Sequence, residues 1–598
     1  MTSKRESTLK SRLTKEFLIS NRLERNMTLR KIQVENFIEK KRFQSHRVEM
    51  EIDVENQQRM GASKARNNSS ESKRYDLYTS LQEKKFDRTD LNEYALMLQS
   101  KDHEQMLTGI VAIRKILSEP SHPPIEQIIQ NGSTHQLMKI IMSVEDERLI
   151  MEILWIFTNI ASSETVFTYF LCVCGVFNLI SYLITKNLST CVKDQLIWLI
   201  ANIAGDNEKY RLEMIERNFH EFIFAFVLDG LPMKTNQNCF WALSNLLRGV
   251  KTINITENLS KIIILCCKVL SSYINHEEYT QFKLGAVDDL IQNSINIISS
   301  VTEYNPCVLS ILLKHHTADH LIEMVEFIKH DKNLFLNVLR ILGNFSANED
   351  SFTAVIVEKN IITVLKKCLQ HKNENSISRE ICWILSNIAA GLEEHTDLFF
   401  RTEGLIETLF NVLKEGETEV KKEALWCVAN LTSSKIHDNI SILVNHGIIQ
   451  IFSDWMNYKD YRIPALIIEA LDNIMLCFIK EDNSRRMIYQ LCEKLEIINK
   501  LEMLSFRHNE IVRSKSEDLL NKYFIFFREA DQEYELNFQD KQNFFYCSGD
   551  DATDESAEIV PILNSLNKNE KEMNKENNPD KNLGNRINCA FLDYSKYV

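Results

Sequence analysis

Pairs of an indole and a carboxamide four residues apart recur along the chain. On a helix, positions i and i+4 lie on the same face, so each pair would present both groups together. A carboxamide can hydrogen bond the backbone of an extended peptide, and neighbouring indole rings form slots for the stems of long cationic side chains. The pairs are Trp155 with Asn159, Trp198 with Asn202, Trp241 with Asn245, Trp383 with Asn387, and Trp426 with Asn430. Their chemistry predicts a surface that binds a basic peptide.

A structural explanation of the same pairs competes with this one. A buried Trp needs a partner for its N–H group, and a buried Asn has four hydrogen-bonding positions to satisfy. A single pair is therefore well explained by contacts that only hold neighbouring helices together. Repetition of the pair in one register favours a surface that holds another chain.

The spacing of the pairs predicts the elements that position them. Successive asparagines are 43 residues apart in two runs, from Asn159 to Asn245 and from Asn344 to Asn473. A helical period of this length is typical of HEAT and armadillo repeats. Ten units of about 43 residues would fill residues 95 to 525, which predicts one elongated repeat domain.

The period slips in the middle of the chain, where Asn245 and Asn344 are 99 residues apart. Gln292 and Asn296 best fit the Trp and Asn positions of the intervening unit, with extra loop on either side. Two later units lack the tryptophan: Arg340 stands before Asn344, and Glu469 stands before Asn473. The first unit lacks the pair altogether, as terminal repeats of solenoids often do.

Composition agrees with an all-α protein of large core. Hydrophobic residues make up 44% of the 598 residues, and Gly and Pro number only 15 and 8. The fourteen cysteines lack the paired spacing of a zinc site, which predicts reduced core thiols in a cytosolic or nuclear protein.

No membrane span or signal peptide is expected. The longest apolar stretch, near Phe170 to Ile184, is shorter than a membrane span and contains Asn178, and the N-terminus is charged from Lys4 onward.

Charge divides the chain into a basic arm and an acidic body. Residues 1–48 hold thirteen Lys/Arg and five Glu, so that a net charge of −13 for the whole leaves −21 on the rest. The arm is helix-prone, with a solvated tail as the alternative explanation, and it can fold back on the body or bind an acidic partner. The expected domains are an arm at 1–58, a flexible linker at 59–89, a solenoid at 90–525 and an acidic, polar disordered tail at 526–598.

The repeated segments resemble those of importin α, the nuclear-import adaptor. The resemblance covers roughly residues 90 to 525 and, more weakly, residues 22–48. It implies an all-α, right-handed superhelical armadillo-repeat solenoid of about ten repeats with flexible N- and C-terminal tails. The matching segments are WIFTNIAS from Trp155, WLIANIAGD from Trp198, WALSNLLRG from Trp241, WILSNIAAG from Trp383, WCVANLTS from Trp426, PPIEQII from Pro123, and the closing segment Leu495 to Phe524.

The resemblance implies two peptide sites for Lys/Arg-rich nuclear localisation signals. In the major site, Asp206 would pair with the deepest lysine, and Thr168, Gln195 and Asn238 would support the backbone. In the minor site, Glu380 and Glu423 would supply anionic partners. The remaining residues of the major site are Trp155, Asn159, Trp198, Asn202, Trp241 and Asn245, and those of the minor site are Arg340, Asn344, Trp383, Asn387, Trp426 and Asn430.

The basic arm resembles the importin-β-binding segment of the family. The residues expected to carry this function are Arg30, Lys31, Lys40, Lys41, Arg42 and Arg47. The cluster by which the family's arm mimics cargo is absent at its expected place, which leaves autoinhibition open. The last repeats resemble the part that meets the export receptor with Ran-GTP. The implied partners are importin β, cargo proteins and that export receptor, for a protein that shuttles between cytoplasm and nucleus.

Other functions fit the sequence less well. It contains no phosphate-cradling glycine loop, no HExxH helix and no nucleophile elbow, so we expect no enzyme, cofactor or metal. Direct nucleic-acid binding conflicts with the −21 body. An armadillo-repeat scaffold for adhesion or cytoskeletal assembly is the alternative, and a scaffold has no need of the basic arm.

Overall fold

The computed structural model describes residues 69–119, 122–228, 233–251, 255–274, 289–371, 374–479, 482–507 and 509–524. Every regular element in these ranges is a helix. The arm expected at 1–58, the first part of the linker and the tail expected at 526–598 lie outside them. The chain divides into two compact units, Met1–Leu520 and Asn521–Val598, and nearly all described residues belong to the first.

A unit of two short helices and a longer third helix recurs along the first compact unit. In one repeat these are α5 (Ile125–Gln130), α6 (Ser133–Ser143) and α7 (Glu147–Ala161). Asp146 caps α7 by accepting a hydrogen bond from the backbone N–H of Arg148. Apolar side chains are buried on nearly every side of α7, because a third helix is enclosed by its own repeat and by both neighbours.

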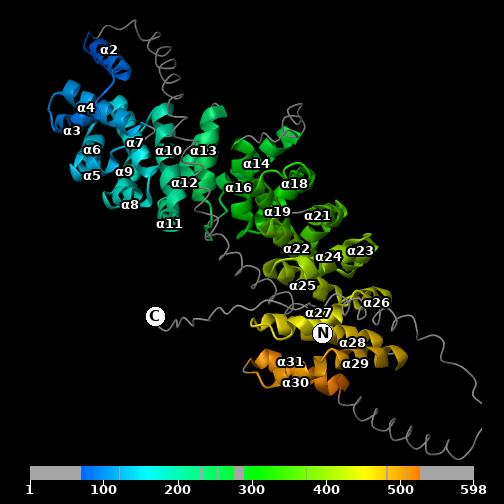
Figure 1. The fold of residues 1–598 in the computed structure, drawn as a ribbon. Helices are drawn as coiled ribbons and strands as arrows, with labels where there is room; N and C mark the ends of the chain where they lie inside the picture. The colour runs from blue at the N-terminus through cyan, green and yellow to red at the C-terminus, as the bar shows by residue number, and fades with distance from the viewer. Residues whose placement is uncertain are drawn as a thin grey trace, which may run out of the picture. The chain divides into compact units, whose positions relative to one another are not determined.

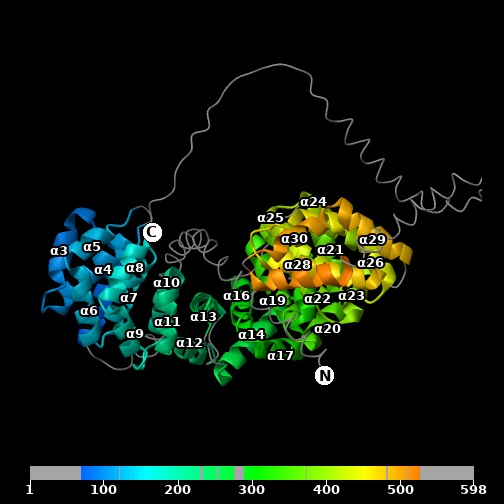
Figure 2. The same ribbon diagram turned by 90° about the horizontal axis from the view of Figure 1, so that it is seen from below.

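The third helices pack one against the next and form the continuous core. Figures 1 and 2 show this succession in chain order, from blue to orange. The third helices are α4 (His103–Leu117), α7, α10 (Thr190–Asp206), α13 (Met233–Leu246), α16 (Asp289–Thr302), α19 (Lys332–Ser346), α22 (Asn375–Ala389), α25 (Thr418–Leu431), α28 (Arg462–Phe478) and α31 (Glu510–Leu519). The predicted all-α armadillo-repeat solenoid of about ten repeats is therefore confirmed.

The first and second helices cover the third helices in each repeat. They are η1 (Arg88–Asp90) with α3 (Leu91–Met97), α5 with α6, α8 (Thr165–Val173) with α9 (Val176–Leu183), α11 (Glu208–Glu216) with α12 (Phe219–Leu228), α17 (Cys307–Lys314) with α18 (Thr317–Val325), α20 (Asp350–Glu358) with α21 (Ile361–Gln370), α23 (Glu393–Arg401) with α24 (Leu405–Glu415), α26 (His437–Asn445) with α27 (Ile448–Trp455), and α29 (Asp482–Lys494) with α30 (Ile497–Ser505). A π-helical turn, η2 (Leu520–Phe524), follows α31.

A left-handed residue makes the turn from the first to the second helix. Gly404 and Gly447 have φ of 69° and 88° directly before α24 and α27, and Asn360 and Glu496 take the same place before α21 and α30. Glycine suits this position because it reaches positive φ without a Cβ clash. The same turn thus recurs even where the glycine is replaced.

The middle repeat departs from this plan where the period slips. One long helix, α14 (Glu257–Ile274), packs against both α16 and α17. Gln292 and Asn296 both lie on α16, the third helix, as the spacing predicts. The additional length therefore falls outside the third helix.

A helix not expected from the sequence precedes the repeats. α2 (Ser69–Glu83) packs against α4. It lies inside the stretch 59–89 for which the sequence predicts a flexible linker, and the structure differs there because residues of α2 hydrogen bond to α4 and α7.

Within the described part of the chain, no single helix is long and apolar enough to cross a membrane. Only α8 and α9 taken together, with a bend of 67° between them, reach the required length and composition.

Candidate functional site

We call the series of Trp and Asn positions along the third helices the ladder, and the pair on one third helix a rung. Six of the ladder asparagines join their third helix to the one before it. Asn159 Nδ2 donates to Ser118 Oγ at 3.0 Å, and Asn387 Nδ2 donates to Ser346 Oγ at 3.2 Å. The same bond recurs from Asn344 to Thr302 at 2.8 Å, from Asn473 to Thr432 at 3.2 Å, from Asn245 to the Ala201 carbonyl at 3.1 Å, and from Asn430 to the Ser386 carbonyl at 2.9 Å. In these six residues, one N–H group of the amide thus has a structural role. This bond does not use the second N–H group or the carbonyl oxygen of the amide.

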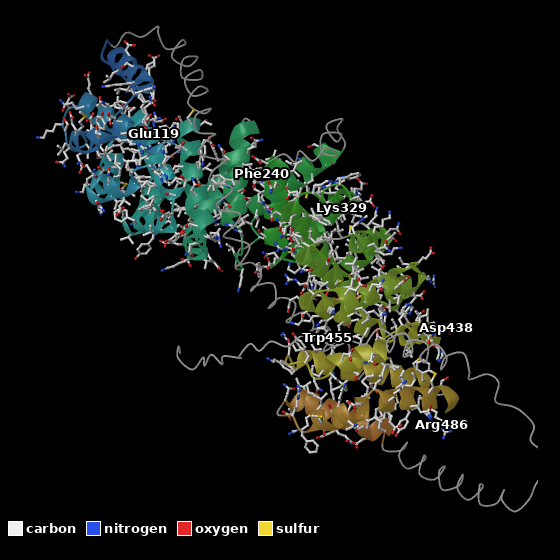
Figure 3. The ribbon with its side chains drawn as sticks, in the orientation of Figure 1. Glu119, Phe240, Lys329, Asp438, Trp455 and Arg486 are labelled. Carbon is white, nitrogen blue, oxygen red and sulfur yellow. The ribbon has the colours of Figure 1, made fainter. Side chains whose placement is uncertain are left out.

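The five ladder tryptophans lie on the same third helices as asparagines of the ladder. Trp155, Trp198, Trp241 and Trp383 are each between 4% and 6% exposed, and Trp426 is half-buried. Gly343 allows Trp383 to lie against α19, because a Cβ on Gly343 would come within 1.9 Å of the ring. The sixth tryptophan, Trp455, ends the second helix α27 and takes no part in the ladder (Figure 3).

Asp206 and Asn202 of α10 carry buried polar atoms that have no hydrogen-bond partner among the described residues. Asp206 Oδ1 accepts a hydrogen bond from Thr165 Oγ1 at 2.9 Å, whereas the buried Oδ2 accepts none. The buried Nδ2 of Asn202 is likewise unbonded. A buried polar atom left without a partner lowers stability by about 1–3 kcal/mol, so a donor and an acceptor from a ligand would relieve both.

The electrostatics of Asp206 support the same conclusion. Burial raises the pKa of its carboxyl group, while the Thr165 hydrogen bond and the Arg211 guanidinium oppose the rise. Arg211 is itself buried and donates to the Ala204 carbonyl at 3.0 Å. A cation placed at Oδ2 would favour the charged carboxylate.

The three supporting residues of the predicted major site contact the protein itself. Thr168 is fully buried and donates to the Ala161 carbonyl at 3.3 Å. Gln195 is buried and donates to Thr158 Oγ1 at 2.8 Å. Asn238 is half-buried and donates to Asp194. These contacts join α8 to α7, α10 to α7 and α13 to α10, and so position the ladder residues between them.

The predicted minor site occupies α19, α22 and α25. Glu380 and Glu423, each three residues before a ladder tryptophan, are both 4% exposed. Arg340 takes the Trp position on α19 and donates to Asn337 Oδ1 at 3.1 Å. Asn337 in turn donates to Asn296 Oδ1 at 2.6 Å, so polar contacts link the altered middle repeat to the start of the minor site.

A buried ion pair at the first rung was missed by the sequence reasoning. Arg114 Nε lies 2.7 Å from Glu152 Oε2, both side chains are 1% exposed, and the guanidinium lies 4.6 Å from the centre of the Trp155 ring. The spacing in the sequence could have indicated this role of Arg114. Arg114 and Ser118 precede Trp155 and Asn159 by 41 residues, and so occupy the Trp and Asn positions of the first repeat.

An ion pair also occupies the last rung. Glu469, in the Trp position of α28, lies 2.7 Å from Lys515 of α31. The carboxylates at both ends of the ladder are therefore paired with cations of the chain itself.

The cysteines of the described residues form no disulfide, and none of the described His, Cys, Asp and Glu groups are arranged to hold a metal. Burial raises the pKa of the Cys172 thiol to about 12, which keeps it in the unreactive form.

Comparison with known proteins agrees with the repeats. No family model matches the chain. It is 25% identical over 436 residues to importin subunit alpha-9 of Arabidopsis thaliana, covering 70% of this chain and 80% of that one. It is 27% identical over 450 residues to importin subunit alpha-4 of the same plant, covering 74% and 79%, and 25% identical over 433 residues to importin subunit alpha-1b of Oryza sativa subsp. japonica, covering 72% and 78%. Among solved structures, the crystal structure of an engineered protein matches with a TM-score of 0.57 at 19% identity, covering 72% and 98%.

Proposed function

The chain belongs to the importin α family, and we propose that it is a nuclear-import adaptor that binds Lys/Arg-rich localisation signals along its ladder and links them to importin β through its basic arm. The observation that carries the proposal is the pair of unsatisfied buried atoms, Asp206 Oδ2 and Asn202 Nδ2, on a ladder helix. An acceptor for a cation beside a donor for a carbonyl fits an extended basic peptide.

In the proposed major site, a lysine ammonium would bind Asp206 while its stem lies against Trp198 and Trp241. Asn202 would donate to the peptide backbone and fix its direction, and the other major-site residues would repeat the arrangement along the ladder. In the proposed minor site, Glu380 and Glu423 would attract further cations beside Trp383 and Trp426.

The proposed protein partners are assigned to the basic arm and to the last repeats. Importin β would bind the arm through Arg30, Lys31, Lys40, Lys41, Arg42 and Arg47, and the export receptor with Ran-GTP would bind the last repeats. Such an adaptor would shuttle between cytoplasm and nucleus.

The peptide site is tested by Asp206→Lys in the full chain, with the affinity for a fluorescent Lys-rich localisation peptide as the measurement. Loss of a central binding residue costs about 2 kcal/mol or more, which is roughly 30-fold in affinity. Asp438→Lys is the matched control, because Asp438 lies exposed on α26 (Figure 3) and makes the same change of charge away from the ladder. Unaltered affinity in Asp206→Lys would refute the pocket.

The arm is tested separately by binding of the full chain to importin β. Replacement of Lys40, Lys41 and Arg42 by alanine should weaken this complex and leave peptide binding by the solenoid intact. A wild-type chain that binds neither importin β nor a basic peptide would favour the scaffold alternative.

A further inference from the structure

Helix α2 covers the first rung of the ladder. Tyr78 Oη donates to Glu152 Oε1 at 2.7 Å, and Gln82 Nε2 donates to the same oxygen at 2.9 Å. The end of α2 is held as well, because Lys115 donates to the backbone carbonyls of Gln82 and Lys84. A helix that precedes the repeats is thereby fastened to their first two third helices.

Glu152 lies on the ladder face of α7. Positions 152, 155 and 159 are spaced i, i+3 and i+7, which places Glu152, Trp155 and Asn159 on one side of the helix. Glu152 is also three residues before its tryptophan, the position held by Glu380 and Glu423 in the later repeats. It is therefore a ladder carboxylate by position.

The two oxygens of Glu152 have different partners. Oε2 accepts from Arg114 Nε at 2.7 Å, inside the solenoid core. Oε1 accepts from the two α2 side chains and only a long bond of 3.4 Å from Arg114 Nη2. Both close bonds to Oε1 thus come from neutral donors on α2.

We infer that Glu152 Oε1 is a further cation-accepting position of the peptide groove, and that α2 closes it through Tyr78 and Gln82. This inference rests on the proposed function. A lysine ammonium makes a charge-assisted bond to a carboxylate that is stronger than one from a neutral phenol or amide. A basic peptide that extends past Trp155 would therefore compete with α2, whereas a short peptide centred on Asp206 would not meet it.

The selectivity follows from this competition. With α2 in place, lysines added to a peptide beyond Trp155 gain little, because Oε1 is already bonded. With α2 detached, the same lysines reach a buried carboxylate. α2 thus sets where a bound signal must end, and Tyr78 and Gln82 are its specificity-determining residues.

The test uses full-length protein, wild type and the Tyr78→Phe/Gln82→Leu double variant, which removes both donors to Glu152 Oε1. It also removes the Gln82 oxygen that accepts from Arg114 Nη2. The ligands are fluorescent peptides with one central Lys-rich cluster, extended at either end by Lys-Lys or by Ser-Ser. In wild type, Lys-Lys at either end should change the affinity less than about 2-fold relative to Ser-Ser. In the double variant, one end should gain about 10-fold or more, the size expected of one charge-assisted bond.

Ser80→Ala is the matched control, since the exposed Ser80 of the same helix donates only to the Leu77 carbonyl at 2.8 Å. It should behave as wild type. A second measurement needs no variant. In wild type, the Lys-Lys peptide that extends past Trp155 should speed amide hydrogen exchange in α2 more than the matching Ser-Ser peptide does. The reason is that its lysines compete with α2 for Glu152.

An equal Lys-Lys gain in wild type and double variant, or no gain in either together with unchanged exchange of α2, would overturn the inference. If the central cluster still binds in an Asp206-dependent manner, the proposed function survives that result. If no basic peptide binds wild type, both fail.

Discussion

Glu152 of α7 and Asp206 of α10 are acidic groups of neighbouring third helices with contrasting partners. Both carboxylate oxygens of Glu152 have close partners: Arg114 pairs with Oε2, and Tyr78 and Gln82 donate to Oε1. Asp206 has one oxygen bonded to Thr165 and one buried oxygen without a protein donor. Donors of the chain itself bond to both oxygens of the carboxylate at the end of the ladder. In the interior, none of the described donors bonds to Asp206 Oδ2. We therefore propose that the interior rung is open to a ligand, whereas the end rung is closed by donors of the chain itself.

The largest expected effect is the loss of stability when the buried Arg114–Glu152 ion pair is removed. Arg114→Met should destabilise the first repeats by about 3–5 kcal/mol, because it leaves the Glu152 carboxylate buried without its cation. Hydrogen exchange of the α4 and α7 amides measures this locally, since repeat proteins do not always unfold as one unit. Lys435→Met, which removes an exposed pair with Glu393, should change the stability of its own repeats little. Similar small effects from both variants would show that the buried pair is not what holds this end.

A second prediction compares the two carboxylates as ligands. Asp206→Asn should weaken binding of a short Lys-rich peptide by about 2 kcal/mol or more, because the unpaired oxygen is lost as a charged acceptor. Glu152→Gln should leave the same affinity within about twofold, because Glu152 faces α2 and Arg114 rather than the peptide. Titration of the fluorescent peptide against both variants is the measurement, and equal losses would remove the distinction between the rungs.

The same contrast extends to the asparagines. Asn387→Ala removes a bond to Ser346 Oγ and should lower the stability of the neighbouring repeats by about 1 kcal/mol. Asn202→Ala removes no hydrogen bond of its amide N–H group, so it should spare stability and weaken peptide binding instead. Local hydrogen exchange and peptide titration together separate the two outcomes. A stability loss of equal size in both variants would contradict the assignment of Asn202 to a ligand.

The repeat architecture could be predicted from the sequence because its cause is local and periodic. A 43-residue step and an i, i+4 pair place Trp198 and Asn202 on one face of one helix whatever the surrounding structure. The turn between first and second helices follows no single residue type, because Gly404 and Gly447 make it in two repeats and Asn360 and Glu496 make it in two others. It was therefore not predicted.

The closure of the first rung could not be predicted, because it depends on contacts far apart in sequence. Tyr78 and Gln82 are 74 and 70 residues from Glu152 and follow no repeat period. The stretch around them is polar and was therefore expected to be a linker. The Thr165 bond to Asp206 spans 41 residues, close to one period, and comparison of neighbouring repeats could have found it.

The smallest expected effect concerns pH and again separates Asp206 from a structural carboxylate. Burial raises the pKa of Asp206 above 3.8 in the free protein. The folded state therefore binds more protons than the unfolded state just above pH 3.8, and this group's contribution to stability falls as pH rises through its raised pKa. A bound lysine favours the charged carboxylate, so peptide binding releases a proton and affinity rises with pH across the same window, by at most about tenfold per pH unit. Peptide affinity between about pH 4 and 7 at constant salt measures the effect, with Asp206→Asn as the control that should lack it. An equal slope in wild type and Asp206→Asn would assign the titration to another carboxylate and leave Asp206 without contact to the peptide cation.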